Sequence, residues 1–331
     1  MGSEFVQLSL TPLVIGVLAA LACALPGNFL LLRRQALIGD AISHVVLPGI
    51  VVAFLLTGTV AAGAMMLGAG GAAIVSVVMI EAIRRLGRIE PGAAMGVVFT
   101  TLFAGGVLLL EVSDTSSVHL DVEHALNGNL ESLIWFAADG WGSLVDPAAL
   151  REVPPQIPRL IIVLIGLLAL LIVFWKELAI STFDPAYAVS VGIPVKTIGI
   201  GLVVATAVAA VAAFDAVGSI LVIAMFVCPP AAARLLTERL AHQVIWSAAI
   251  ATLSAVLGYV LAGYGPAWFG FDHAVSAAGM IATVSGLILG GACLAGPHRR
   301  AVGGHALGDK DTVLEPIEPS HSLKQRGSVA D

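Results

Sequence analysis

Long uncharged apolar runs alternate along the chain with short segments that carry charges. The runs Leu160 to Trp175 and Ile198 to Ala213 contain no charged residue and approach the thickness of the hydrocarbon core of a bilayer. In lipid every backbone donor and acceptor must be paired internally, and these runs are too long and too uniformly apolar for barrel strands. The pattern therefore predicts an all-α fold, a polytopic bundle of transmembrane helices.

Hydropathy divides this bundle into about eight or nine spans. The predicted spans are 12–32, 42–58, 60–81, 93–111, 158–175, 197–213, 216–229, 243–263 and 274–295. Composition agrees, because 58% of the 331 residues are apolar and only 11% are charged, whereas soluble domains carry about a quarter charged residues. No basic patch suited to nucleic acid is present, so no nucleic-acid partner is expected.

The charges indicate an orientation. Every second short loop is basic, and cytoplasmic loops retain an excess of Lys and Arg. The residues that mark these loops are Arg33, Arg34, Arg84, Arg85, Arg88, Lys176, Lys196, Arg234, Arg239, Arg299 and Arg300. This alternation predicts an N-terminus outside and a C-terminus in the cytoplasm. The acidic segment 112–157 then forms an external loop.

The ends of the chain differ from the bundle. Residues 1–300 are predicted to form the transmembrane domain, and 301–331 a disordered cytoplasmic tail, because the tail is too polar to bury a core. Residues 1–5 lack the basic start of a signal peptide, so the first apolar run is expected to remain as a span. Whether those five residues are native or a cloning remnant is open.

The most informative polar pair is Asp40 and His44, which opens the apolar run of the second span. Because the two residues are four positions apart, both side chains lie on one face of a helix. An ionisable residue in a span is costly and by default faces the bundle interior or an aqueous pathway. One oxygen and one nitrogen ligand suit Mn, Fe or Zn ions. The same spacing also fits a helix-capping Asp40 and a hydrogen-bonded core His44.

A resemblance to a known family enters at this segment. Gly39-Asp40-Ala41-Ile42-Ser43-His44-Val45-Val46-Leu47-Pro48-Gly49 resembles the signature of permeases in manganese, zinc and iron importers of the ATP-binding cassette class. Three further stretches resemble that family in the same order. They are Val118 to Leu130, Asp184-Pro185 with Gly192-Ile193-Pro194, and Val217-Gly218 through Leu236. The resemblance covers roughly residues 10–296.

The resemblance implies an assembly in the bacterial inner membrane. Its expected members are this multi-pass permease, a second permease chain that is identical or paralogous, cytoplasmic ATP-binding subunits, and an extracytoplasmic metal-binding protein. Asp40 and His44 are then expected to contact Mn²⁺ or Fe²⁺, with Zn²⁺ also possible, during transport, and no cofactor is expected to be bound permanently. Asp121 and His124 have the residue types for a second, external metal contact. A docking surface for the binding protein or a plain solvated loop fits the same segment.

Energy is expected to come from outside the chain. No Gly-x-x-x-x-Gly-Lys-Ser/Thr motif occurs, so this chain is not itself an ATPase. The short basic loop 230–242, with Pro230, Ala231, Arg234 and Leu235, is expected to contact the ATP-binding subunit. The two arginines, Arg234 and Arg239, could equally act only as topology determinants.

Two classes of protein other than a permease can be compared with this sequence. An ion-gradient-driven secondary metal transporter would use intramembrane carboxylates as coupling sites, and Asp215 and Asp272 near span ends fit that reading. No inverted repeat supports it. An intramembrane metalloprotease would require a motif such as His-Glu-x-x-His, which is absent.

Overall fold

The long elements of the chain are helices, and their order follows the predicted apolar runs. A computed structural model describes residues 4–58, 62–112, 128, 130–268, 270 and 275–295. The long helices are α2 (Thr11–Leu32), α3 (Leu37–Thr57), α4 (Ala62–Gly87), α5 (Pro91–Val112), α8 (Gln156–Val173), α11 (Val195–Leu236), α12 (Leu240–Trp268) and α13 (Ala277–Ala295). The shorter ones are η1 (Phe5–Leu10), η2 (Leu130–Ser132), η3 (Trp141–Leu144), α7 (Pro147–Leu150), α9 (Trp175–Phe183) and α10 (Pro185–Ser190).

Seven helices in the described part of the chain are long and apolar enough to cross a membrane. The apolar part of α3, His44–Thr57, is shorter. The prediction of an all-α membrane bundle is therefore confirmed. The predicted spans 197–213 and 216–229 both fall within α11, and the predicted division between them lies close to a kink at Gly218.

A sharp break at Gly218 divides α11 into two halves. Gly218 has φ 73° and ψ 174°, a conformation open to glycine and strained for other residues. Gly128, also at positive φ, packs directly on this break, because a Cβ at Gly128 would lie 2.3 Å from the carbonyl carbon of Val217. Two of the stretches that resemble the family, far apart in sequence, thus meet at one backbone contact.

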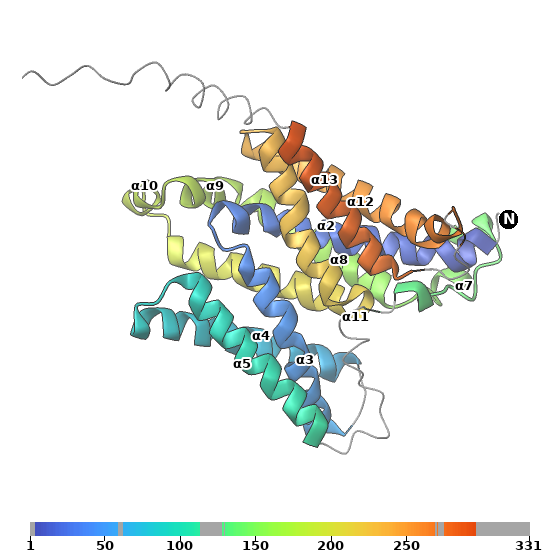
Figure 1. Cartoon of the computed structure of the whole chain (residues 1–331), viewed down its shortest axis with the longest axis horizontal. Helices are drawn as coiled ribbons and strands as arrows, with labels where there is room; N and C mark the ends of the chain where they lie inside the picture. Colours follow the sequence, from blue (N-terminus) through green and yellow to red (C-terminus); the bar gives the residue numbers. More distant parts are fainter. Residues whose placement is uncertain are drawn as a thin grey trace, which may run out of the picture.

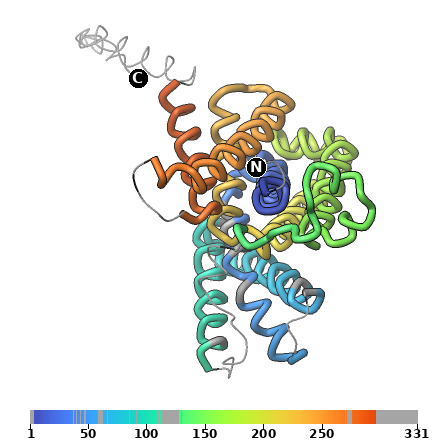
Figure 2. Tube along the Cα trace, turned by 90° about the vertical axis from the view of Figure 1, so that its right-hand side faces the viewer, coloured from blue at the N-terminus to red at the C-terminus, as the bar shows by residue number. Residues whose placement is uncertain are grey.

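Helix α2 is the centre of the larger part of the molecule. It packs against α8, α11 and α12, and Figure 2 shows its N-terminal end surrounded by the later helices. Ile15, Cys23, Phe29 and Leu30 on α2 are fully buried, as a central helix requires. A hydrogen bond of 3.2 Å from Gln243 Nε2 to Asn28 Oδ1 joins α12 to α2 inside this apolar packing.

Helices α3, α4 and α5 form a second group, which lies beside the first and contacts it mainly through α3 and α11 (Figure 1). Their outer faces are exposed and apolar. Leu67, Val78 and Leu108 are among the most exposed large side chains of this group. Such faces are compatible with lipid or with another membrane chain.

The predicted loop over 112–157 contains several short helices in its described part. Helix α5 continues to Val112, and residues 130–155 include η2, η3 and α7. Trp135 is buried with Val6 and Ala149, and its indole donates a 3.0 Å hydrogen bond to the Ala149 carbonyl oxygen. Trp135 thus gives this part of the predicted loop a small core that it shares with Val6 near the N-terminus.

The predicted loop over 230–242 is also mostly helical. Helix α11 continues to Leu236 and α12 begins at Leu240, so only a tight corner separates them. The adjacent prolines Pro229 and Pro230 lie inside α11, although proline tends to end a helix. The surrounding packing thus overrides the local preference of proline to end a helix.

Candidate functional site

The segment 39–49 is held in place by close packing on three sides. A Cβ at Gly39 would lie 2.7 Å from the Phe226 ring on α11, and one at Gly49 would lie 2.5 Å from the Gly68 carbonyl oxygen on α4. On α5, a Cβ at Gly106 would lie 2.6 Å from the Pro48 side chain. Small residues allow such close approach between helices in a membrane.

The apolar residues of the segment complete this packing. Ala41, Ile42, Val45 and Val46 are all buried almost completely. Most of the family-like signature is therefore explained by contact between α3 and its neighbours.

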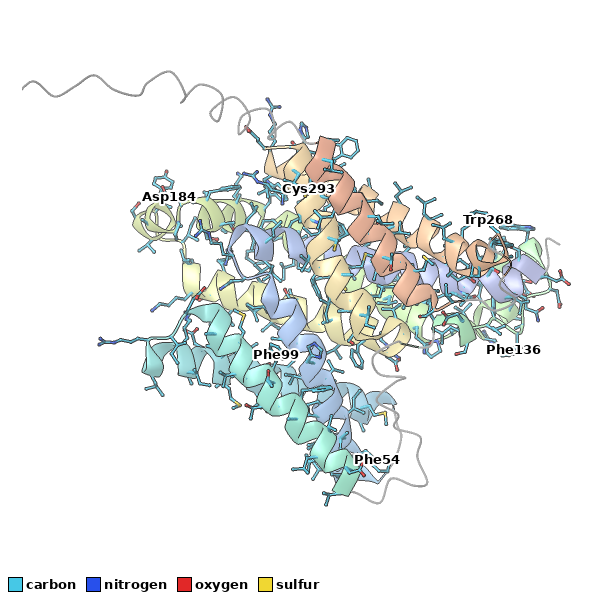
Figure 3. The ribbon with its side chains drawn as sticks, in the orientation of Figure 1. Phe54, Phe99, Phe136, Asp184, Trp268 and Cys293 are labelled. Carbon is cyan, nitrogen blue, oxygen red and sulfur yellow. The ribbon has the colours of Figure 1, made fainter. Side chains whose placement is uncertain are left out.

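His44 lies between two aromatic rings of α5. Its imidazole stacks on Phe99, with ring centroids 5.4 Å apart and planes 21° apart, and meets Phe103 edge-on at 5.5 Å. Phe99 lies near the middle of the α3–α5 group (Figure 3). His44 is partly exposed, and it is roughly 10 Å along the helix axis from the start of α3. The two rings restrict the orientation of the imidazole.

Asp40 lies on the same continuous helix as His44. Helix α3 begins at Leu37 and its N-cap is Ala36, so Asp40 is inside the helix and is not its N-cap residue. This removes the N-cap alternative for Asp40. The Asp40 side chain lies outside the described part of the structure, so the pair rests on helical spacing.

Two cavities lie at different levels along the α3–α5 group. One, of about 500 Å³, reaches Ile38 and Ile42 of α3 and the basic end of α4. The other, of about 660 Å³, begins at Val45 and extends to Thr57, with mainly apolar walls. His44 comes between Ile42 and Val45 in the sequence and lines neither cavity.

The external candidates Asp121 and His124 lie outside the described residues, as does Asp272. In the part of the chain that is described, no group of three or more His, Cys, Asp or Glu side chains is arranged to hold a metal ion. Asp215 is described, and its carboxylate forms a 2.9 Å ion pair with Arg159 of α8. A contact between two helices thus accounts for Asp215.

The four residues expected to contact the ATP-binding subunit have different environments. Pro230 is buried against Gly27 of α2, and Leu235 packs on an apolar cluster that includes Ile250. Ala231 is partly buried. Arg234 donates a 3.0 Å hydrogen bond from Nη1 to the Glu238 carbonyl oxygen and so caps the corner. Pro230 therefore has a packing role.

Sequence reasoning missed the contact that Arg33 makes with α9. Its guanidinium donates from Nε to Thr182 Oγ1 at 3.0 Å and from Nη2 to Ser181 Oγ at 2.8 Å. Burial lowers the pKa of Arg33, whose contacts here are neutral hydroxyl groups. In the sequence Arg33 indicates only orientation, because its partners Ser181 and Thr182 are distant along the chain.

The helices α9 and α10 form a projecting pair at the end of the molecule where Asp184 lies (Figure 3). Asp184 caps α10 by accepting a 2.8 Å hydrogen bond from the Tyr187 backbone N–H, and Gly192 follows α10 at φ 83°. These two residues belong to the family-like stretch at 184–194, and they shape α10. Four apolar side chains in and beside α10 are exposed: Phe183, Tyr187, Val189 and Val191.

Comparison with known proteins supports the resemblance found in the sequence. The profile of the ABC 3 transport family matches residues 6–134 and 154–293. The manganese transport system membrane protein MntD of Bacillus subtilis (strain 168) is 40% identical over 85% of this chain and 90% of its own length. The zinc transport system membrane protein TroD of Treponema pallidum (strain Nichols) is 36% identical over 83% of this chain and 70% of its own length.

Solved structures agree on the fold. A chain of PsaBC from Streptococcus pneumoniae, solved in complex with Fab, superposes with a TM-score of 0.70 at 25% identity, covering 89% of this chain and 94% of that chain. An inward-facing metal-chelate type ABC transporter gives a TM-score of 0.63 at 13% identity, over 88% and 87% of the two chains, and supports the fold alone. The chain therefore belongs to the ABC 3 transport family, and it is a multi-pass membrane permease of an ATP-binding cassette transport system, not itself an enzyme.

Proposed function

We propose that this permease forms the translocation pathway for a divalent transition metal ion imported across the bacterial inner membrane, and that Asp40 and His44 are transient ligands of that ion. The observation that carries the proposal is the position of His44, an imidazole inside an apolar helical group, with its ring held by Phe99 and Phe103. Placing an ionisable side chain among apolar helices costs free energy, and such residues in membrane proteins typically mark the pathway of a transported ion.

The residue types suit a transient site. A carboxylate and an imidazole form an incomplete ligand set, and a transport site must bind strongly enough to receive the ion and weakly enough to release it. Nitrogen and oxygen ligands without thiolate suit Mn²⁺, Fe²⁺ or Zn²⁺. We favour manganese or iron over zinc because of the resemblance of the segment around Asp121 to the family; the relatives include both a manganese and a zinc transport protein.

A second permease chain would complete the pathway. The described walls of the larger cavity are mainly apolar, and the smaller cavity has four cationic side chains, so neither suits a bare divalent cation. The exposed apolar faces of α3–α5 provide a surface on which another membrane chain would pack. The PsaBC neighbour is consistent with a permease pair. The expected extracytoplasmic metal-binding protein would deliver the ion on the external side, where Asp121 and His124 remain candidates for contact.

The cytoplasmic ATP-binding subunit would contact the α9–α10 pair. Phe183, Tyr187 and Val189 are 56%, 55% and 65% exposed, and they lie outside the long apolar helices, where water would otherwise surround them. Arg234 and Ala231, at the α11–α12 corner, would supply the edge of that contact. Pro230 and Leu235 are better explained by packing within the permease.

Arg33 would carry movement of α9 to the metal ligands. It follows α2, it is hydrogen-bonded to Ser181 and Thr182 of α9, and α3 begins shortly after it at Leu37. A displacement of α9–α10 by the ATP-binding subunit would therefore reach Asp40 and His44 through the α2–α3 turn.

Uptake of manganese, iron and zinc by cells carrying Asp40→Ala or His44→Ala tests the proposal. We expect both variants, at normal membrane levels, to lose uptake by at least the roughly tenfold to 100-fold that supporting substitutions cost at metal sites. Gly70→Ala on α4 is the control, because nothing lies within 4 Å of a Cβ there and the residue is outside the proposed ATPase contact. Normal uptake of every metal by both variants would exclude the proposed site.

The alternative, a secondary transporter driven by an ion gradient, makes a different prediction. Such a transporter would continue to work when the partner ATPase is inactivated and would stop when the gradient is collapsed. We expect the reverse in vesicles that contain the whole complex. The ion pair of Asp215 with Arg159 also provides a structural role for one of the two carboxylates that this alternative requires.

A further inference from the structure

The smaller cavity, of about 500 Å³, combines an apolar wall with a cationic rim. It opens between the α2–α3 turn, α4, α5, α9 and the start of α11. Its lining includes the buried apolar side chains of Ile42, Ile80, Met95 and Val203. Its charged lining residues are Arg33, Arg34, Arg84, Lys196 and Glu81. These five come from three separate parts of the sequence.

The charges that line this cavity do not cancel. Glu81 is the one carboxylate among the described lining residues, and it forms a 2.9 Å ion pair with Arg84. Arg33 is half-buried, and its hydrogen bonds go to the hydroxyl groups of Ser181 and Thr182. Among the described residues no carboxylate is paired with Arg33, and desolvation of its guanidinium therefore favours the binding of an anion beside it. The exposed Arg34 and Lys196 add to the positive potential.

We propose that this cavity binds one anionic phospholipid. The phosphate group would lie against Arg33, Arg34 and Lys196, and an acyl chain would follow the apolar wall past Ile42 and Met95. Guanidinium and ammonium groups are suited to phosphate, and basic pockets between membrane helices on the cytoplasmic side are suited to anionic headgroups. The cavity belongs to the end of the molecule where the basic turns gather, which is predicted to face the cytoplasm. The apolar wall distinguishes a lipid from a small free anion.

Native mass spectrometry of the full-length protein tests the proposal directly. The purified protein is incubated in detergent with phosphatidylglycerol, with phosphatidylcholine, or with phosphatidylglycerol plus millimolar inorganic phosphate. We expect one phosphatidylglycerol to be retained preferentially over phosphatidylcholine, and inorganic phosphate not to displace it. The double variant Arg34→Gln/Lys196→Gln should bind phosphatidylglycerol roughly thirtyfold more weakly, at about 1 kcal/mol for each cation removed.

The matched control is Arg88→Gln, which removes one cation from the α4–α5 turn without altering the cavity lining. It should bind phosphatidylglycerol like the intact protein. Equal retention of the two lipids, or equal retention by the double variant and the intact protein, would overturn the proposal. Displacement by inorganic phosphate would overturn the lipid assignment in favour of a free anion. A thermal unfolding midpoint measured without lipid, unchanged in the double variant, excludes a folding defect as the cause.

Discussion

Gly49 of α3 and Gly68 of α4 face each other where the two helices cross. A Cβ on Gly49 would lie 2.5 Å from the Gly68 carbonyl oxygen, and a Cβ on Gly68 would lie 2.3 Å from the Gly49 carbonyl oxygen. Both distances are far inside van der Waals contact, so neither position accepts a side chain without movement of a backbone. This crossing fixes the position of α3, the helix that carries Asp40 and His44.

Gly49→Ala or Gly68→Ala should destabilise the permease. Overpacking at a close contact costs about 1–3 kcal/mol, so the thermal unfolding midpoint in detergent should fall and metal uptake should fall with it. Gly70→Ala on the same helix is the control, because nothing lies within 4 Å of a Cβ there. If Gly68→Ala and Gly70→Ala unfold at the same temperature, the crossing is not as close as described.

Phe103→Leu should weaken metal uptake while leaving the protein folded. The edge-on contact of Phe103 with the His44 ring orients the imidazole, and aromatic pairs contribute about 0.5–1.5 kcal/mol. Concentration-dependent manganese uptake should show an apparent KM raised by roughly twofold to tenfold. Phe54→Leu, further along α3, serves as the control and should leave KM unchanged. An unaltered KM in Phe103→Leu would mean that this ring does not position the imidazole.

Arg33→Lys should separate ATP hydrolysis from transport. A lysine retains the charge, but it cannot reproduce the two hydrogen bonds from Nε and Nη2 to Thr182 and Ser181. We expect the reconstituted complex to hydrolyse ATP and to move fewer metal ions for each ATP consumed. Arg34→Lys, at the neighbouring exposed residue, should keep the normal ratio. If both variants move the same number of metal ions for each ATP, Arg33 does not transmit movement from α9 to α3.

Asp215→Asn should leave metal uptake close to that of the intact protein. The Asp215 carboxylate is about half exposed and pairs with Arg159, and ion pairs at exposed positions contribute about 0–1 kcal/mol. A small decrease in stability is expected, and it should be matched by Arg159→Gln. Complete loss of uptake in Asp215→Asn at normal protein levels would favour the secondary transporter instead.

The helices were predictable because each follows an apolar run that needs no information beyond the local sequence. Trp135 shows the limit of that approach, since it forms a small core with Val6 only after two distant segments meet. The predicted division between the spans 197–213 and 216–229 lies close to the break in α11, but the position of the break at Gly218 and its contact with Gly128 required the fold.

The candidate site was predicted in part. The spacing of Asp40 and His44 was visible in the sequence, and the helix that carries them is present. The rings of Phe99 and Phe103 come from another helix, and no periodicity connects them to His44. Arg33 likewise required the fold, because its two hydroxyl partners follow it by about half the length of the chain.

The break in α11 has a mechanical consequence for α3. The half before Gly218 touches α3 at Val46, through Val211 and Phe214, and the half after it touches α3 at Gly39, through Phe226. If the angle between the two halves of α11 changes, these two contacts with α3 move relative to each other. The resulting shear falls on the turns of α3 between Gly39 and Val46, the interval that contains both proposed ligands, Asp40 and His44.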